Sequence, residues 1–295
     1  MFIIATMQEV MFMKGKQMID LTDFEHYLRV KKKLADRSVQ TYLYHCKLYF
    51  RQYSELTDEN LVEWKENQID SLKSASAINT ALNSFRNYIE FKKLDVQIPK
   101  SVPAQRKQFI ENVISRADYD YLCNYLVSKF GISKTKKYER YYIPIRIMGT
   151  TGLRMNELLN VKVEDIKQGA FDIYGKRNKL RRIYIPEKAQ KELLNLLQGI
   201  GITSGFAVTD TKGKQYKVRA FQDMLIRLGE ETGIDTSLMH PHGFRHFFAK
   251  EFMKNHNDIC LLSDLLGHSK LDTTRIYLKM TSREQRDVVN SVVDW

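Results

Sequence analysis

The sequence contains few cysteines and few prolines, with 3 and 5 respectively among 295 residues. Cys46, Cys123 and Cys260 lie far apart, are odd in number and lack metal-ligand spacing, which excludes a disulfide framework and a cysteine metal site. The sequence therefore predicts a protein of a reducing compartment, the cytoplasm.

Long apolar runs are also missing. No window reaches the ~18 consecutive apolar residues that a membrane-spanning helix needs, so we expect no membrane partner. Residues 1–18 include an apolar stretch, but no basic residue precedes it and no small-residue cleavage site follows it, which argues against a signal peptide. Because this stretch holds several methionines that could each be the start, we treat 1–18 as an N-terminal extension.

What the sequence has in excess is basic charge. Its 47 Lys and Arg exceed its 35 Asp and Glu, which gives a formal net charge of +12. Basic and acidic residues are equal in number between 19 and 95, so the excess lies further along the chain. An excess of this kind favours a polyanionic partner, with nucleic acid first and an acidic membrane surface second.

Apolar residues recur at helical spacing through residues 19–95. Thr22 followed by Glu25 predicts a capping box at the first helix, and Ser38 is the predicted cap of the second. Two further amphipathic helices follow, joined by short polar turns. The pattern predicts a four-helix domain over 19–95.

The stretch 96–110 interrupts the helical periodicity. It contains two of the five prolines and no acidic residue. We therefore predict an extended basic linker that contacts a polyanion through Lys100, Arg106 and Lys107.

Residues 111–295 combine helical patterns with one change of period. The segments GAFDIYG and RRIYIP alternate as strands do, and they flank a basic stretch, which predicts a hairpin with a long exposed tip. Helical patterns lie on both sides of this hairpin. The chain is thus predicted to be mainly α with a small β-sheet (α+β), with a second domain over 111–295.

The segment TGLRMNE places an arginine close to a predicted helix start. Gly152 permits a tight turn there, and Glu157 lies three positions after Arg154, where it can support its neighbours. Taken alone, such an arginine is usually a surface charge.

The segment HPHGFRH begins another helix, which Pro241 helps to start. His242 and Arg245 are three positions apart and so project on one face, a pairing that suits phosphate binding. A solvated face is the alternative. His240 and His246 add a metal-binding alternative, although no acidic or cysteine ligand completes the set.

The segment LLGHSKLDTTRIY contains a candidate nucleophile. Gly267 can end a helix in the left-handed conformation, His268 follows it, and Tyr277 lies nine positions later. A tyrosine hydroxyl titrates near ~10, so it needs neighbouring cations or a base to act as a nucleophile at neutral pH. For a single tyrosine, packing in the core is the alternative.

The predicted hairpin tip KRNKLRR has five basic residues in seven. Such a stretch is typical of a solvated or phosphate-contacting loop, here through Arg177 and Lys179. Lys176 follows Gly175 at the end of the first strand, where it could donate a proton to a leaving oxygen.

In their order and spacing, TGLRMNELL, YGKRNKLRRIYIP, HPHGFRH and LLGHSKLDTTRIY resemble the tyrosine recombinase family, which includes phage integrases and Xer-type recombinases. The resemblance covers nearly the whole chain. It implies a core-binding domain over 19–95 and a catalytic domain over 111–295. It also implies catalysis without a metal, another cofactor or ATP, and a homotetramer on paired double-stranded DNA sites.

The resemblance further implies a role for each matching residue. Tyr277 attacks a DNA phosphate held by Arg154 and Arg245, leaving a 3′-phosphotyrosyl link and a free 5′-hydroxyl. Lys176 acts as the general acid. The implied set is completed by His242 for proton transfer, His268 on the phosphate and Glu157 in support.

The sequence departs from the family pattern in one loop, where the common GKGxK pattern has lost its second glycine. We assign the general acid to Lys176 rather than Lys179.

Two alternatives from other classes stay open, namely a DNA-binding protein without cleavage activity and a relaxing topoisomerase. The segment after Tyr277 has one apolar face that either packs on its own domain or docks on a neighbouring protomer. The target sequence, and the choice among integration, excision and resolution, stay open as well.

Overall fold

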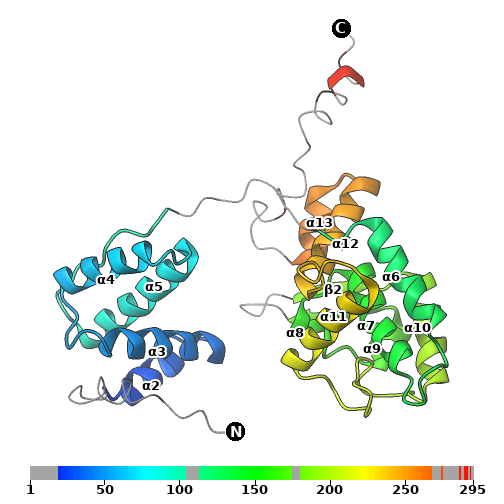
Figure 1. Cartoon of the computed structure of the whole chain (residues 1–295), viewed down its shortest axis with the longest axis horizontal. Coiled ribbons are helices and arrows are strands. Elements are labelled where there is room, and N and C mark those ends of the chain that lie inside the picture. The colour runs from blue at the N-terminus through cyan, green and yellow to red at the C-terminus, as the bar shows by residue number, and fades with distance from the viewer. Residues whose placement is uncertain are drawn as a thin grey trace. The chain divides into compact units, whose positions relative to one another are not determined.

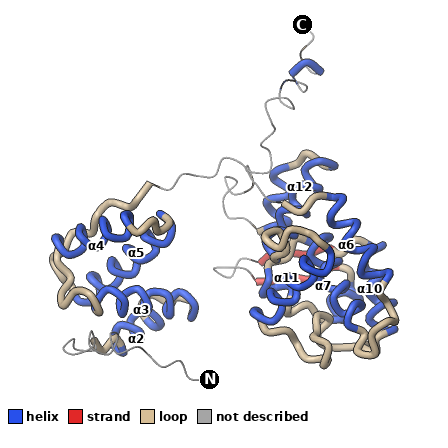
Figure 2. The backbone as a smooth tube through the Cα atoms, viewed as in Figure 1, coloured by secondary structure: helices blue, strands red, loops and turns tan. Residues whose placement is uncertain are grey.

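The computed structural model describes residues 19–103, 113–174 and 180–267, together with 274, 286, 289–291 and 293. The chain divides into two compact units, the first ending at Arg106 and the second starting at Lys107. The described residues are mainly helical and contain one two-stranded sheet (Figures 1 and 2), which confirms the predicted class. Within the described ranges, none of the helices has the length and apolar character needed to span a membrane.

The first unit contains four described helices around one core. α3 packs against α5, α4 also packs against α5, and α2 contacts both α3 and α5. The Phe85 ring lies 4.9 Å from those of Tyr49 and Trp64, so aromatic side chains from three helices meet in this core. The helices are α2 (Thr22–Val30), α3 (Asp36–Phe50), α4 (Asp58–Asp70) and α5 (Ala75–Lys92).

The starts of the first two helices differ from the predicted caps. The Thr22 amide donates to the Asp20 carboxylate at 2.9 Å, so Asp20, before α2, accepts the bond that the predicted capping box assigned to the Glu25 side chain. α3 begins at Asp36, two residues before Ser38. Both predicted caps were wrong, because a carboxylate at each start interacts favourably with the exposed amides and the positive end of the helix dipole.

The second unit is built around α7, which packs against α6, α10 and α12. The short helix α9, which the periodicity did not reveal, contacts α10 and β1. The elements are α6 (Arg116–Ser128), α7 (Lys137–Thr151), α8 (Met155–Leu158), α9 (Val163–Gln168), β1 (Ala170–Tyr174), β2 (Leu180–Tyr184), α10 (Glu187–Gly199), α11 (Val218–Thr232), α12 (Pro241–Asn255) and α13 (Ile259–Leu266).

The two strands form the predicted antiparallel hairpin, with Ile173 opposite Arg181 and Asp172 opposite Arg182. In β2 the burial alternates, so Arg181 and Ile183 face inward while Arg182 faces solvent. The predicted strand RRIYIP, which contains both arginines, is therefore confirmed, and counting the same two arginines in the hairpin tip KRNKLRR was wrong. Residues 175–179, where the rest of the predicted tip falls, lie outside the described residues.

Two helix ends in the second unit follow the local sequence. α12 starts with Pro241, whose missing N–H removes a donor that would have no helical partner. α13 ends at Gly267 with φ of +63°, a left-handed conformation that glycine adopts without a Cβ penalty. α13 packs against α12 and β2, which places the end of α13 beside the strand.

Candidate active site

Arg154 lies at the start of α8, immediately after the turn at Gly152 that ends α7. Its backbone amide donates to Glu157 Oε2 at 2.7 Å, and its Nη1 donates to Glu157 Oε1 at 3.0 Å. Glu157 is therefore the group that orients Arg154 at this helix start. The Arg154 side chain is 39% exposed, so solvent reaches it.

Arg245 projects from α12 into the interior and is 2% exposed. Its Nη1 donates to the Gly152 carbonyl and its Nη2 to the Leu266 carbonyl, both at 2.6 Å. One buried guanidinium thus connects the turn before Arg154 with the end of α13.

The carboxyl end of α13 is held by arginines. The last carbonyls of a helix have no helical partner and carry the negative end of its dipole, so cations are favourable there. Three successive carbonyls each accept from a different arginine: Leu265 from Arg181 at 2.9 Å, Leu266 from Arg245 and Gly267 from Arg154 at 3.1 Å.

Arg181 is a site residue that the sequence reasoning missed. Its side chain is 5% exposed, and its Nη2 forms an ion pair with Glu157 Oε2. Burial lowers the pKa of Arg181 below its usual value, while the charge of Glu157 opposes that shift. The alternation of side chains along a strand could have identified Arg181 from the sequence, because it places Arg181 on the same inward face as Ile183.

His242 lies one turn before Arg245 on α12. Loss of water around its ring, followed by the charges of Arg245, His240 and Arg154, lowers the pKa of His242 below the usual value. The imidazole is therefore neutral near pH 7 and can accept a proton.

The other two histidines of this segment have structural surroundings. His240 Nδ1 accepts from the Gly243 amide at 3.0 Å and so caps α12. The His246 ring lies 5.1 Å from that of His242. The described part of the chain contains no group of three or more His, Cys, Asp or Glu placed to hold a metal ion.

The described ranges cover part of the predicted set. They bring together Arg154, Glu157, His242 and Arg245, and they show Lys100 as an exposed residue of the first unit. The remaining predicted residues lie outside the described residues: Arg106, Lys107, Lys176, Arg177, Lys179, His268 and Tyr277.

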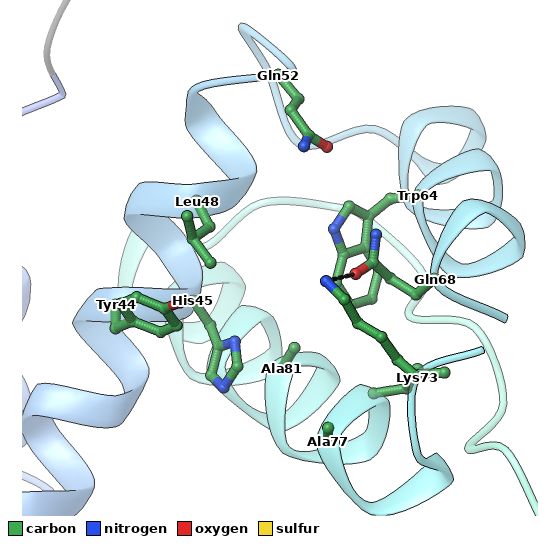
Figure 3. Close-up of a pocket in the computed structure, with 10 residues that line it drawn as sticks. Tyr44, His45, Leu48, Gln52, Trp64, Gln68, Lys73, Ala77 and Ala81 are labelled. Atoms are coloured by element: carbon green, nitrogen blue, oxygen red, sulfur yellow. Dashed lines mark hydrogen bonds between the residues drawn. The ribbon is translucent and has the colours of Figure 1, made fainter. Parts of the chain in front are cut away.

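The first unit has a separate hollow of about 300 Å³ between α3, α4 and α5. Figure 3 shows Tyr44 and His45 on one side of it, and the Lys73 ammonium donating to the Gln68 side-chain carbonyl at 2.7 Å on the other. Burial lowers the pKa of His45 below the usual value. The hollow contributes no residue to the predicted catalytic set.

The arginine cluster fits an anionic ligand. A guanidinium has five N–H groups, and two of those on Arg154 are used by Glu157 and Gly267 within the described structure. Planar guanidinium donors held in place by backbone carbonyls match the non-bridging oxygens of a phosphodiester. The cluster is therefore a candidate binding site for a phosphodiester.

The chain belongs to the phage integrase family, whose model matches residues 118–284, more than half of the sequence. It is therefore a tyrosine recombinase, an enzyme that breaks and rejoins DNA strands at specific sites. The family confirms the resemblance drawn from the four sequence segments, and it does not favour a DNA-binding protein that lacks cleavage activity.

Curated relatives match over nearly their full length. Tyrosine recombinase XerA of Thermococcus kodakarensis is 25% identical over 272 residues, which cover 90% of this chain and 92% of that protein. Tyrosine recombinase XerD of Listeria monocytogenes is 26% identical over 292 residues, which cover 91% and 96%.

Solved structures share the fold. The Tn1549 transposon integrase in complex with transposon right end DNA matches with a TM-score of 0.70 at 15% identity, covering 91% of this chain and 98% of that chain. The XerH site-specific recombinase bound to a palindromic difH substrate matches with a TM-score of 0.66 at 19% identity, covering 92% and 83%.

Proposed function

We propose that Tyr277 is the nucleophile with which this recombinase cleaves DNA. The observation that supports the proposal is the meeting of Arg154, Glu157 and Arg245 at the end of α13, ten residues before Tyr277 in the sequence. Cations at this place stabilise the charge that develops on a phosphate during attack, and they favour ionisation of a nearby phenol.

In the proposed reaction, the Tyr277 oxygen forms a bond to phosphorus while the bond from phosphorus to the 5′-oxygen breaks. The phenolic proton passes to His242, whose lowered pKa keeps the ring neutral beforehand. Lys176 gives a proton to the leaving 5′-oxygen. The products are a 3′-phosphotyrosyl link and a free 5′-hydroxyl.

The proposed phosphate contacts divide between exposed and buried groups. Arg154 donates its remaining N–H groups to a non-bridging oxygen of the phosphate, and His268 donates a further hydrogen bond. Arg245 is buried and stabilises the negative charge of the phosphate through its own positive charge. Since the phosphotyrosyl ester keeps the energy of the broken bond, a 5′-hydroxyl from another strand can attack it and restore Tyr277 without ATP.

The proposed partner is double-stranded DNA, with recombination sites paired in a homotetramer. Solved neighbours of the same fold are described as complexes with DNA, and one is described as a dimer on a core site. We propose that residues 19–95 form a core-binding domain and that the cytoplasm is the compartment. The proposed further DNA contacts are Lys100, Arg106, Lys107, Arg177 and Lys179.

A covalent-capture experiment tests the nucleophile on a mixture of DNA sequences, so it needs no defined target site. The protein is incubated with sheared genomic DNA from its own source that carries random nicks. Denaturation with dodecyl sulfate and precipitation with potassium then recover DNA attached to protein, and sequencing identifies the site. We expect an adduct whose tryptic peptide carries a nucleotide on Tyr277.

Tyr277→Phe is expected to abolish the adduct and to retain binding of the recovered site. Tyr184→Phe is the matched control, because Tyr184 is an exposed tyrosine of β2 and should react as the wild type does. An adduct that persists in Tyr277→Phe, or no adduct in the wild type, contradicts the assignment.

A further inference from the structure

Arg181 is one of three charged residues that the described structure buries, together with Glu139 and Arg245. Glu139 accepts a hydrogen bond from the Gly131 amide at 2.8 Å and closes a surface loop. Arg181 has no such local role, because it joins β2 to α8 through Glu157 and to α13 through the Leu265 carbonyl. A buried charge of this kind is costly unless its partners are held in good geometry.

Glu157 is shared between Arg154 and Arg181. Its Oε1 accepts from Arg154 Nη1, while its Oε2 accepts from the Arg154 amide and from Arg181 Nη2. Arg154 thus binds both carboxylate oxygens itself, and Arg181 adds a bond to Oε2 from β2, a different segment of the chain. This bond ties the Glu157 carboxylate, which orients the Arg154 guanidinium, to the strand.

Arg181 also contacts the second group that holds Arg154. A Cβ added to Gly267 would lie 2.6 Å from Arg181 Cδ, so the arginine stem packs directly on this glycine. The Gly267 carbonyl in turn accepts from Arg154 Nη2. Both acceptors of the Arg154 side chain within the described structure are therefore in contact with Arg181.

We infer that Arg181 is a positioning residue for DNA cleavage, which holds Glu157 and the end of α13 so that Arg154 directs its outward N–H groups at the phosphate. The inference rests on the proposed function. With a side chain that is 5% exposed, Arg181 acts on the phosphate through Arg154 rather than by contact.

A double-mutant cycle tests the inference. The rate of adduct formation is measured in single turnover on a nicked duplex carrying the site recovered by covalent capture, at saturating DNA, and binding of the same duplex is measured separately. Arg181→Lys keeps the charge but cannot reach both Glu157 and Leu265. We expect it to slow cleavage by about 10- to 100-fold, a loss of some 1.4 to 2.8 kcal/mol in transition-state stabilisation, with duplex affinity within about twofold.

The cycle repeats Arg181→Lys in an Arg154→Lys background. If Arg181 acts through Arg154, Arg181→Lys slows cleavage by less than about threefold relative to the Arg154→Lys single variant. Arg182→Lys is the matched control, since Arg182 is the neighbouring arginine on the solvent side of β2 and pairs with Asp172. Its cleavage rate should equal that of the wild type.

Two outcomes overturn the inference while leaving the proposed function standing. They are an equal loss of rate in both backgrounds, and a loss of duplex affinity that accounts for the loss of rate. Should Arg181→Lys unfold below the assay temperature, Glu157→Gln replaces it in the cycle, with the same dependence on Arg154 expected. A wild-type protein that forms no adduct refutes the proposed function and, with it, the inference.

Discussion

Arg154 and Gly267 are separated by 113 positions in the sequence, and Arg154 Nη2 donates to the Gly267 carbonyl at 3.1 Å. The bond joins the start of one helix to the end of another. Gly267 directly precedes His268 in the sequence, so this bond ties the first residue of the predicted catalytic set to the residue that comes before His268. Four predictions concern this region and the cores that support it.

Gly267→Ala is expected to lower the free energy of unfolding by about 2 kcal/mol and to slow DNA cleavage. A left-handed residue with a Cβ costs about 1–2 kcal/mol, and here the new methyl would also displace the Arg181 stem. Urea unfolding and single-turnover cleavage measure the two effects.

Gly233→Ala is the matched control for this substitution. Gly233 ends α11 with φ of +73°, and an added Cβ would meet nothing within 4 Å. It should show the backbone cost alone, with cleavage unchanged. Equal effects of the two substitutions on cleavage would show that the Arg181 contact is unimportant.

Arg245→Lys is expected to slow cleavage at least about 100-fold and to cost about 1–3 kcal/mol of stability. A lysine ammonium cannot span the Gly152 and Leu266 carbonyls as the two Nη atoms do, so one buried acceptor loses its donor. Single-turnover cleavage and urea unfolding measure these losses. Arg219→Lys is the control, because Arg219 forms an exposed ion pair with Asp223, and it should change neither the cleavage rate nor the stability. A wild-type cleavage rate in Arg245→Lys would remove Arg245 from the catalytic set.

His246 is expected to make stability depend on pH. Burial, followed by the charges of His242, His240 and Arg245, lowers the pKa of His246 to about 4 from an ordinary value of 6.5. Between these values the unfolded chain binds the proton and the folded chain does not, so stability falls as pH decreases through this window. The expected loss is about 2 kcal/mol, measured by urea unfolding between pH 7.5 and 4.5.

His246→Gln should reduce this pH dependence, because the substituted side chain does not titrate. The rest comes from His45, His240 and His242, whose pKa values burial also lowers. His256→Gln removes an exposed histidine at the end of the same helix and should leave the dependence in place. A slope that is unchanged by His246→Gln would show that another group causes it.

The three cysteines are expected to react with iodoacetamide in a set order. Cys260 is exposed and should react first. Burial raises the pKa of the Cys123 thiol to about 11 and that of Cys46 to about 12, which suppresses the reactive thiolate. Mass spectrometry along a urea series would follow the unfolding of the first unit through labelling of Cys46 and that of the second unit through labelling of Cys123. Early labelling of Cys46 in the native protein would contradict its burial.

Arg181 and Arg182 show which structural features the sequence could predict and which it could not. Adjacent in a basic stretch, they were grouped with the residues of an exposed tip. In the structure Arg182 pairs with Asp172 in solvent, while Arg181 is buried against Glu157 and α13. The alternation of a strand was legible in the sequence, but the face of β2 that α13 covers was not.

The sequence by itself determined the features that depend on neighbouring residues. These are the mainly helical class, the hairpin, the proline that begins α12 and the glycine that ends α13, and the four segments whose order identifies the family. Backbone conformation at such positions is set within a few residues, so it can be predicted locally.

Only the tertiary structure decided which arginines are buried and what they bind. Arg154, Arg181 and Arg245 reach three consecutive carbonyls across separations of 113, 84 and 21 positions. Burial and hydrogen-bond partners over such distances depend on how α8, β2, α12 and α13 pack, because a guanidinium is retained in the interior only where packing brings acceptors to it.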